Sequence, residues 1–302
     1  MNGKKRRNHG LTICLVILAL ALAGAIIWGV YTAAKTLLHY SDSAQIGTDE
    51  TEQAEVPGES MADSEENVEA TEIEGLPKNR YEPACFYEED GIRRYESDTL
   101  EGVPGIDVSS HQTDIDWAQV KEAGIEFAMI RLGYRGYATG ELALDEYFER
   151  NIQEAQAAGI QVGVYFFSQA LNEEEAVEEA EYVIDWLENY EITYPVVFDW
   201  EEIDDPQART NEMNMLLLTS CAAAFCRTVE EAGYRAGIYF NQAYGYQQFN
   251  LLSLKDHIFW LAQYEEAPTF VYDFQMWQKS NSGSVPGISG PVDLNICFWN
   301  KS

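Results

Sequence analysis

Two acidic side chains, Asp199 and Glu201, end an apolar run that reads YPVVFDWEE over residues 194–202. In a β-strand, residues i and i+2 point to the same face, so both carboxylates would point the same way with roughly 7 Å between their α-carbons. Packing alone does not explain paired acids here, because unpaired charge in an apolar setting is costly. The pair predicts an acid/base site at the carboxyl end of a strand. Solvated loop acids are the alternative in a chain whose formal net charge is −32.

Paired carboxylates suit the hydrolysis of a glycosidic bond. The glycosidic oxygen leaves poorly, so one carboxyl group must stay protonated while a second stabilises an oxocarbenium-like transition state. Ionising Asp199 disfavours ionising Glu201, so the two would titrate as a unit. The spacing leaves open whether water attacks directly with inversion or a group of the substrate attacks with retention.

Short apolar runs recur from residue 105 onward and predict eight strands. They begin near residues 105, 127, 162, 195, 236, 258, 274 and 292. Helical patterns separate the first five, for example over 145–159 and 172–190, and this alternation implies parallel strands with right-handed crossovers. We therefore expect an α/β fold, an irregular barrel of eight strands with helices after about the first five. In such a barrel the chemistry collects at the carboxyl ends of the strands.

Further acids fall at these strand ends. Asp107 lies in the first strand, and Asp293 lies in the eighth, which would neighbour the first on closure. Aromatic and amide side chains occupy the other ends: Tyr165, Phe167, Tyr239, Asn241, Gln263, Tyr264, Gln275 and Trp277. Acids ringed by aromatic side chains are typical of a sugar-binding cleft, because aromatic faces stack on pyranose rings.

Structural alternatives exist for several of these residues. Trp277 and Phe167 could belong to the barrel core, because bulky residues fill barrel interiors. Asp107 and Asp293 could each pair with an arginine such as Arg131. The joint occurrence of four acids at three strand ends favours a functional site.

The N-terminal part of the chain has a different composition. Basic residues at 4–7 precede an apolar segment over 11–34, which is long enough to cross roughly 30 Å of hydrocarbon. The basic cluster predicts that residues 1–10 are cytoplasmic and that the rest is extracytoplasmic. Residues 35–80 are acidic and poor in large apolar side chains, which predicts a disordered linker. We expect a bacterial single-pass membrane protein; a secreted protein with a cleaved signal peptide is the alternative.

Beyond the linker, alternation around Asp90-Gly91 predicts a hairpin-like lead-in over 81–102, followed by the barrel domain over 103–302. Cys85 and Cys297 lie near opposite ends of this domain and could join them. The few scattered histidines and the lack of a Cys-x-x-Cys motif predict no metal and no cofactor. The acidic charge makes nucleic acid an implausible partner.

An ordered set of motifs resembles the family 25 glycoside hydrolases, which are bacterial and phage lysozymes. The motifs are GIDVSSHQ and IDW over 105–117, FAMIRLGYRGY from 127, VGVYFFSQA from 162, VVFDWE from 196, GIYFN from 237, WLAQY from 260 and PVDLN from 291. One departure is Thr113-Asp114, where the family usually has a small turn residue or glycine. The resemblance implies an N-acetylmuramidase that cleaves the β-1,4 bond between N-acetylmuramic acid and N-acetylglucosamine in peptidoglycan glycan strands.

The resemblance also implies residue roles. Glu201 is similar to the general acid, Asp199 to its partner, and Asp107 and Asp293 to the remaining acids. The residues expected to contact substrate are Tyr165, Arg131, Tyr239, Asn241, Gln263 and Trp277. Because every sugar of this polymer carries a 2-acetamido group, attack by that group is favoured over attack by water.

Two other functions remain open. A non-catalytic wall-binding module on the same fold would have no reason to keep a costly cluster of like charges. A chitinase-like glycosidase would be expected to carry a DxxDxDxE run, which YPVVFDWEE lacks.

Overall fold

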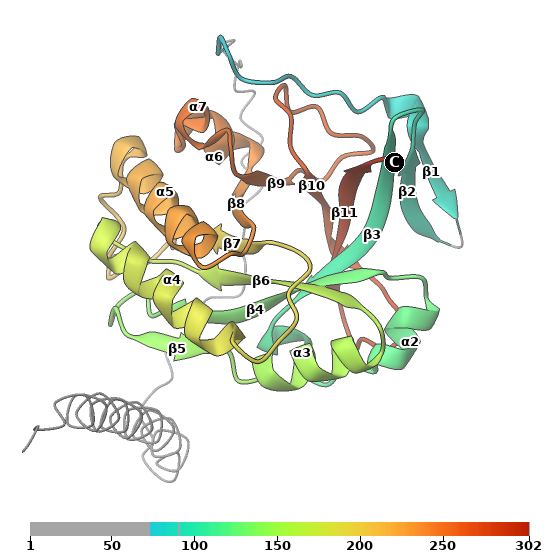
Figure 1. Cartoon of the computed structure of the whole chain (residues 1–302), viewed down its shortest axis with the longest axis horizontal. Helices are drawn as coiled ribbons and strands as arrows, with labels where there is room; N and C mark the ends of the chain where they lie inside the picture. The colour runs from blue at the N-terminus through green and yellow to red at the C-terminus, as the bar shows by residue number, and fades with distance from the viewer. Residues whose placement is uncertain (1–72, 90, 302) are drawn as a thin grey trace, which may run out of the picture. The chain divides into compact units, whose positions relative to one another are not determined.

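Apolar β-branched and aromatic residues form eight strands that close into a barrel (Figure 1). The computed structural model describes residues 73–89 and 91–301. The barrel strands are β3 (Leu100–Val108), β4 (Phe127–Arg135), β6 (Gln161–Phe167), β7 (Val196–Asp199), β8 (Ala236–Asn241), β9 (Ile258–Ala262), β10 (Met276–Gly283) and β11 (Val292–Asn300). Pairing of β3 with both β4 and β11 closes the circle, so the predicted eight-stranded α/β barrel is confirmed.

The eighth strand departs from the parallel arrangement. The strands from β3 to β10 pair in parallel around the barrel, whereas β11 is antiparallel to both β10 and β3. The connection over 284–291 contains no helix, so the chain reverses as in a hairpin and does not cross back. The first residues of β11 consequently lie beside the carboxyl end of β3, where Asp293 pairs with Asp107.

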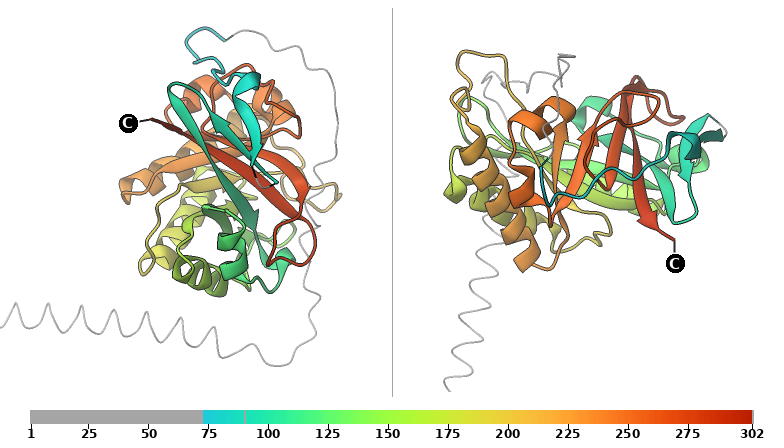
Figure 2. Two further views of the ribbon diagram at one scale, coloured as in Figure 1. Left: turned by 90° about the vertical axis from the view of Figure 1, so that its right-hand side faces the viewer. Right: turned by 90° about the horizontal axis from the view of Figure 1, so that it is seen from above.

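Helices follow each of the first five barrel strands, as expected from the sequence. They are α2 (Trp117–Glu122), α3 (Phe148–Ala157), α4 (Glu173–Leu187), α5 (Met215–Glu231), α6 (Gln242–Gln247) and α7 (Leu251–Leu254). Asn172, Asn214 and Asn241 cap the starts of α4, α5 and α6 by accepting backbone N–H hydrogen bonds. Figures 1 and 2 show α4 and α5 packed side by side on the outside of the barrel.

A hairpin of β1 (Phe86–Glu89) and β2 (Ile92–Glu96) precedes the barrel. Tyr95 pairs with Gly102 at the start of β3, so the hairpin continues the sheet beyond the barrel wall. Phe86 packs edge-on against Trp277 with ring centroids 5.3 Å apart, and against Phe298 at 6.2 Å. Figure 1 shows the hairpin on the side opposite α4 and α5.

Two apolar layers hold the barrel. Side chains alternate along each strand, so Phe198 of β7 packs outward against α5 while Val197 points into the interior. Cys297 belongs to the interior layer, whereas Cys85 packs against the outer one. Both thiols are free, so the disulfide that the sequence left open is not formed. The barrel wall separates their surroundings.

A short β5 (Leu142–Leu144) extends the sheet at the end of β4.

At the N-terminal side, the last part of the predicted linker is ordered against the barrel. Leu76 is buried, Lys78 forms a β-bridge with Tyr272, and the Asn79 side chain donates to the carbonyl of Phe270 at 2.8 Å. The expected disordered linker therefore does not extend to residue 80.

The predicted membrane span over 11–34 lies outside the described residues. Among the helices of the described part, none is long and apolar enough to cross a bilayer.

Candidate active site

A narrow cavity opens inside the barrel at the carboxyl ends of the parallel strands. Its lining consists of Asp107, Tyr165, Asp199, Glu201, Tyr239, Trp260 and Gln278. Five of these seven were predicted from the sequence as site residues. All three carboxylates are buried, with Glu201 the most exposed at 8%. The structure thus brings acids from two distant strands to one enclosed space.

The end of β7 positions the Asp199–Glu201 pair. Asp199 pairs in register with Phe167 of β6 and Tyr239 of β8, and its backbone carbonyl accepts a hydrogen bond from the Ser168 N–H at 2.6 Å. Since Val197 faces the interior, alternation places Asp199 on the same face. Glu201 follows two residues later and also lines the cavity, so both acids point inward as predicted.

A buried glutamine holds the segment beyond β7. The Gln169 side-chain amide donates to the backbone carbonyl of Glu201 at 3.1 Å, and its oxygen accepts from the Thr210 hydroxyl at 2.7 Å. Gln169 has no exposed surface. These hydrogen bonds fix the main chain of Glu201 without using its carboxylate.

The second pair of acids is bridged by an amide. Gln278 Nε2 donates to Asp107 Oδ2 at 3.0 Å and to Asp293 Oδ2 at 3.3 Å. Asn295 Nδ2 donates to the same Asp107 oxygen at 2.6 Å. Asp293 does not line the narrow cavity itself, but it shares a hydrogen-bond donor with Asp107, which does.

Aromatic donors fix the orientation of these amides. The hydroxyls of Tyr239 and Tyr264 each donate to Gln278 Oε1 at 2.9 Å, and the Trp260 indole N–H donates to Asn295 Oδ1 at 2.8 Å. With both oxygens engaged, the NH₂ groups of Gln278 and Asn295 must face the acids. Sequence reasoning missed Gln278, Asn295 and the role of Trp260. The two-residue period groups Trp260 with Ala262 and Gln278 with Met276, but it does not say which face of β9 or β10 lies inside.

Tyr239 remains a neutral donor in this setting. Burial raises the pKa of Tyr239 well above its ordinary value, and the nearby acidic groups of Tyr264, Glu201, Asp199 and Asp107 act in the same direction. Its phenolic proton is therefore retained across the neutral range, which keeps the hydrogen bond to Gln278 in place.

Arg131, predicted to contact substrate, forms a buried ion pair with Asp145. Its Nη2 lies 2.8 Å from Asp145 Oδ2, its Nε donates to the same oxygen at 2.9 Å, and Nη2 also donates to the Ser110 hydroxyl at 3.0 Å. Ser110 begins the 3-10 turn Ser110–Gln112 that directly follows β3. Arg131 thereby fastens the segment after Asp107 to β4.

Two residues predicted to bind substrate, Trp277 and Gln263, do not line the cavity. The Trp277 side chain is fully buried in the outer layer and donates its indole N–H to the Gln263 carbonyl at 2.7 Å. The Gln263 side chain donates to Gln242 and Thr269 and accepts from the backbone of Thr269 and Phe270. Both residues therefore hold the loop after β9. Trp277 lies outside because side chains alternate along β10, so its neighbour Gln278 faces the barrel interior.

The remaining predicted residues lie at the rim. Asn241 ends β8 and caps α6 by accepting from the Tyr244 N–H at 2.8 Å. Phe167 packs with Ile203 and Ala208 in a small apolar cluster at the end of β6. Thr113 has a φ of 53°, a value that favours glycine. Threonine therefore occupies this turn in a backbone conformation that suits the small residue or glycine usual in the family.

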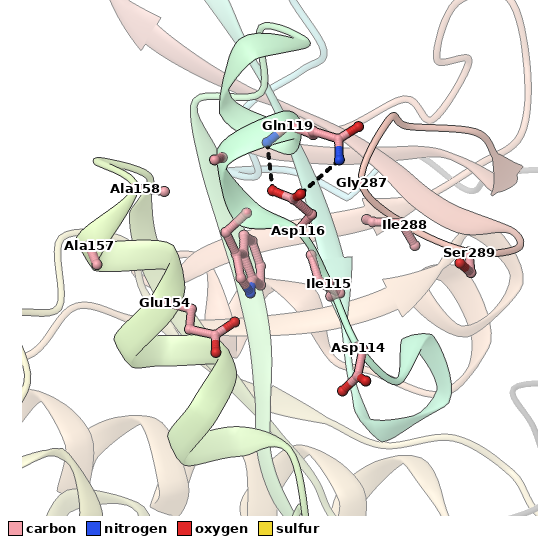
Figure 3. A pocket seen from close by; sticks show the side chains of 12 residues that line it. Asp114, Ile115, Asp116, Gln119, Glu154, Ala157, Ala158, Gly287, Ile288 and Ser289 are labelled. Carbon is pink, nitrogen blue, oxygen red and sulfur yellow. Dashed lines mark hydrogen bonds between the residues drawn. The ribbon is translucent and has the colours of Figure 1, made fainter.

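A larger hollow of about 840 Å³ lies on the outside of the barrel, between α2, α3 and residues 287–289 (Figure 3). Asp116 there caps α2, with Oδ1 accepting from the Gln119 backbone at 3.1 Å and Oδ2 from its side chain at 2.7 Å. None of the strand-end acids lines this hollow. Among the described residues, no group of acids, histidines or cysteines is arranged to hold a metal ion.

Comparisons with known proteins agree with this geometry. The family model of glycosyl hydrolases family 25 matches residues 106–288. Lysozyme M1 of Streptomyces globisporus is 32% identical over 209 residues, which cover 64% of this chain and 67% of that protein.

Solved structures support the fold. The modular autolysin LytC of Streptococcus pneumoniae, determined with a synthetic peptidoglycan ligand, superposes with a TM-score of 0.61 and 24% identity over 71% of this chain. The chain spans only 52% of the length of that LytC structure. The lysozyme from Streptomyces coelicolor superposes with a TM-score of 0.52 and 27% identity, covering 64% of this chain and 91% of the other.

Proposed function

Because the chain belongs to glycosyl hydrolases family 25, we propose that this glycoside hydrolase cleaves the β-1,4 bond between N-acetylmuramic acid and N-acetylglucosamine in peptidoglycan. The observation that carries the proposal is the convergence of Asp107, Asp199 and Glu201 on one buried cavity at the carboxyl ends of the strands. The similarity to a lysozyme and to an autolysin solved with a peptidoglycan ligand supports this substrate.

In the proposed mechanism Glu201 donates the proton to the leaving oxygen. Asp199 holds the 2-acetamido group of the substrate and offsets the positive charge that develops as this group attacks. Asp107 and Asp293, bridged by Gln278, carry further negative charge near the oxocarbenium-like transition state. Tyr165, Tyr239 and Trp260 supply aromatic surface around the cavity.

Digestion of two polymers side by side tests the substrate and the bond. The protein is incubated with purified peptidoglycan and with chitin, and new reducing ends are reduced with borohydride and identified by mass spectrometry. We expect reduced N-acetylmuramic acid from peptidoglycan and no product from chitin. Release of reducing N-acetylglucosamine, cleavage of chitin, or binding to the wall without cleavage would each contradict the proposal.

The anomer of the first product tests the route of attack. If the acetamido group attacks, an oxazolinium-like intermediate forms and water then opens it, so the first product keeps the β-configuration. Proton NMR within the first minutes, before mutarotation, distinguishes this product from the α-anomer that direct attack by water gives. A thiazoline analogue of the intermediate should inhibit only in the first case.

We also propose that residues 11–34 anchor the protein in a bacterial membrane, with the barrel outside. The support is the length and apolar composition of this segment and the basic residues before it. Fractionation followed by N-terminal sequencing tests this: an anchored protein sediments with membranes, whereas a soluble form that starts near residues 25–35 indicates a cleaved signal.

A further inference from the structure

A second cavity of about 430 Å³ lies where the N-terminal hairpin meets the barrel rim. Arg93 of β2 forms one wall, the loop after β9 forms another with Tyr264 and Glu266, and Lys279 of β10 lies between them. The family match begins at residue 106, after the hairpin. This cavity therefore combines the family barrel with a segment that precedes it.

The second cavity adjoins the candidate active site through one side chain. Tyr264 lines the second cavity, and its hydroxyl donates to Gln278, whose amide bonds both Asp107 and Asp293. Lys279 directly follows Gln278 on β10, at a point where the pairing of β10 with β11 shifts register, and it lines the second cavity. A substituent of a sugar bound at the acids could thus reach the second cavity around Tyr264.

Arg93 lies deeper in this cavity than the acids beside it. The Arg93 side chain is 15% exposed, whereas those of Glu88 and Glu266 are 50% and 97% exposed. The Arg93 guanidinium lies 5.5 Å from the Phe86 ring centroid and donates to the Glu266 carbonyl at 2.7 Å, which fixes its position. It is also paired with the carboxylates of Glu88 at 3.3 Å and Glu266 at 3.7 Å.

Lys279 is the cation available to a ligand. It is partly buried, and its ammonium group makes no hydrogen bond or ion pair with residues in 73–89 or 91–301. A partly desolvated ammonium beside an oriented guanidinium is a favourable place for a carboxylate, because charge-assisted hydrogen bonds are the strong ones.

We propose that this second cavity binds a carboxylate of the short peptide that peptidoglycan carries on the lactyl group of N-acetylmuramic acid. This inference rests on the proposed function. The peptide is attached to the sugar whose bond is cleaved. It would therefore extend from the active site into its immediate surroundings, where the second cavity lies. The chain has a net charge of −32, so long-range attraction does not draw in an anionic peptide, and local cations must do so.

Binding of a fragment tests the site without requiring turnover. The full chain is titrated calorimetrically with N-acetylmuramoyl-L-alanyl-D-glutamate, and the affinities of the wild type, Lys279→Gln and the control Lys255→Gln are compared. Lys255 is exposed at the end of α7 and does not line the cavity. We expect Lys279→Gln to weaken binding about fivefold or more, and the control to match the wild type. Equal affinity of Lys279→Gln and wild type would overturn the proposal.

Kinetics on two forms of the same glycan add a second test. Strands that carry peptides are compared with strands stripped of them by an amidase. We expect Lys279→Gln to raise KM about fivefold on peptide-bearing strands with kcat unchanged, and to match the wild type on stripped strands. Equal losses on both substrates would show a general structural effect and overturn the peptide site. A wild-type protein that binds the fragment through Lys279 but cleaves neither glycan would refute the proposed function and leave the peptide site standing.

Discussion

Asp107 and Glu179 are both buried carboxylates, 4% and 0% exposed, but the structure treats them differently. Asp107 borders the cavity inside the barrel and accepts hydrogen bonds from the neutral amides of Gln278 and Asn295. Glu179 lies on α4 outside the barrel wall, and Arg135 Nε donates to it at 2.7 Å. Amides orient a carboxylate without cancelling its charge, whereas a guanidinium cancels it. The carboxylate of Asp107 therefore keeps a charge that can act on a substrate, whereas that of Glu179 serves to join two elements of the fold.

The Arg135–Glu179 pair joins β4 to α4. Arg135 also donates to Glu178 at 2.8 Å and to the carbonyl of Gly140 at 2.8 Å, so it ties the end of β4 to α4. Burial raises the pKa of Glu179 to about 7, while Ser168, Arg135 and the backbone of Gln169 act in the opposite direction. Gln169 in turn holds the main chain of Glu201.

Replacing Glu201 should separate activity from stability most clearly. We expect Glu201→Gln to lose about two to four orders of magnitude in rate, because the general acid is gone, while the barrel stays folded and still binds glycan. Turnover is measured on peptidoglycan and folding by thermal denaturation. A variant with near-normal turnover, or one that fails to fold, would contradict the assignment.

Replacing Arg135 should do the reverse. We expect Arg135→Met to lower the free energy of unfolding by about 3–5 kcal/mol, because it leaves the buried Glu179 without its guanidinium. Urea denaturation measures the loss. The double variant Arg135→Met with Glu179→Leu should recover part of it. A loss below about 1 kcal/mol in the single variant would remove the distinction between the two carboxylates.

The raised pKa of Glu179 predicts a dependence of stability on pH. The folded state binds this proton more tightly than the unfolded state, so the contribution is fully present below about pH 4.5 and is lost as the pH rises through about 7. The free energy of unfolding of the wild type, relative to Glu179→Gln, should fall across this window, by on the order of 1–3 kcal/mol. Parallel curves for the two proteins would refute it.

Removing the amide bridge should have the smallest effect. We expect Gln278→Leu to lower kcat roughly tenfold, because the hydroxyls of Tyr239 and Tyr264 lose their acceptor and the acids at Asp107 and Asp293 lose their shared donor. Gln161→Leu, at an exposed position on β6, serves as the control. Unchanged kinetics in Gln278→Leu would mean that the amide bridge does not position the acids.

The sequence predicts the parts of the site that one strand specifies by itself. Asp199 and Glu201 share a face because they are two residues apart at the end of an apolar run, and this needs no knowledge of the partners. In β10 the run FQMWQ is apolar on both faces, so alternation alone does not say which face is inside. The sequence therefore predicts Trp277 in the cleft, whereas the structure has Gln278 there.

The direction of β11 could not be predicted either, because it depends on the partner strand and not on the local sequence. A strand with no helix before it can run either way, and only the pairing with β3 decides. Closure of the barrel predicts that Asp293 lies beside Asp107, and the structure confirms this pairing. The strand that carries Asp293 is antiparallel to β3, and its first residues lie at the rim. The hydrogen bonds that join Gln278 to both acids depend on three strands at once, and no local pattern encodes them.

The pairing of Asp107 with Asp293 also has a consequence for biosynthesis. These residues come from the first and last strands of the barrel, so most of the domain must be made before they can meet. Contacts between segments far apart in the sequence form late, because closing the long loop between them costs entropy before any pairing repays it. A nascent chain that has not yet extruded β11 from the ribosome therefore lacks the completed cavity. The proposed hydrolytic activity would appear only as translation of the barrel ends.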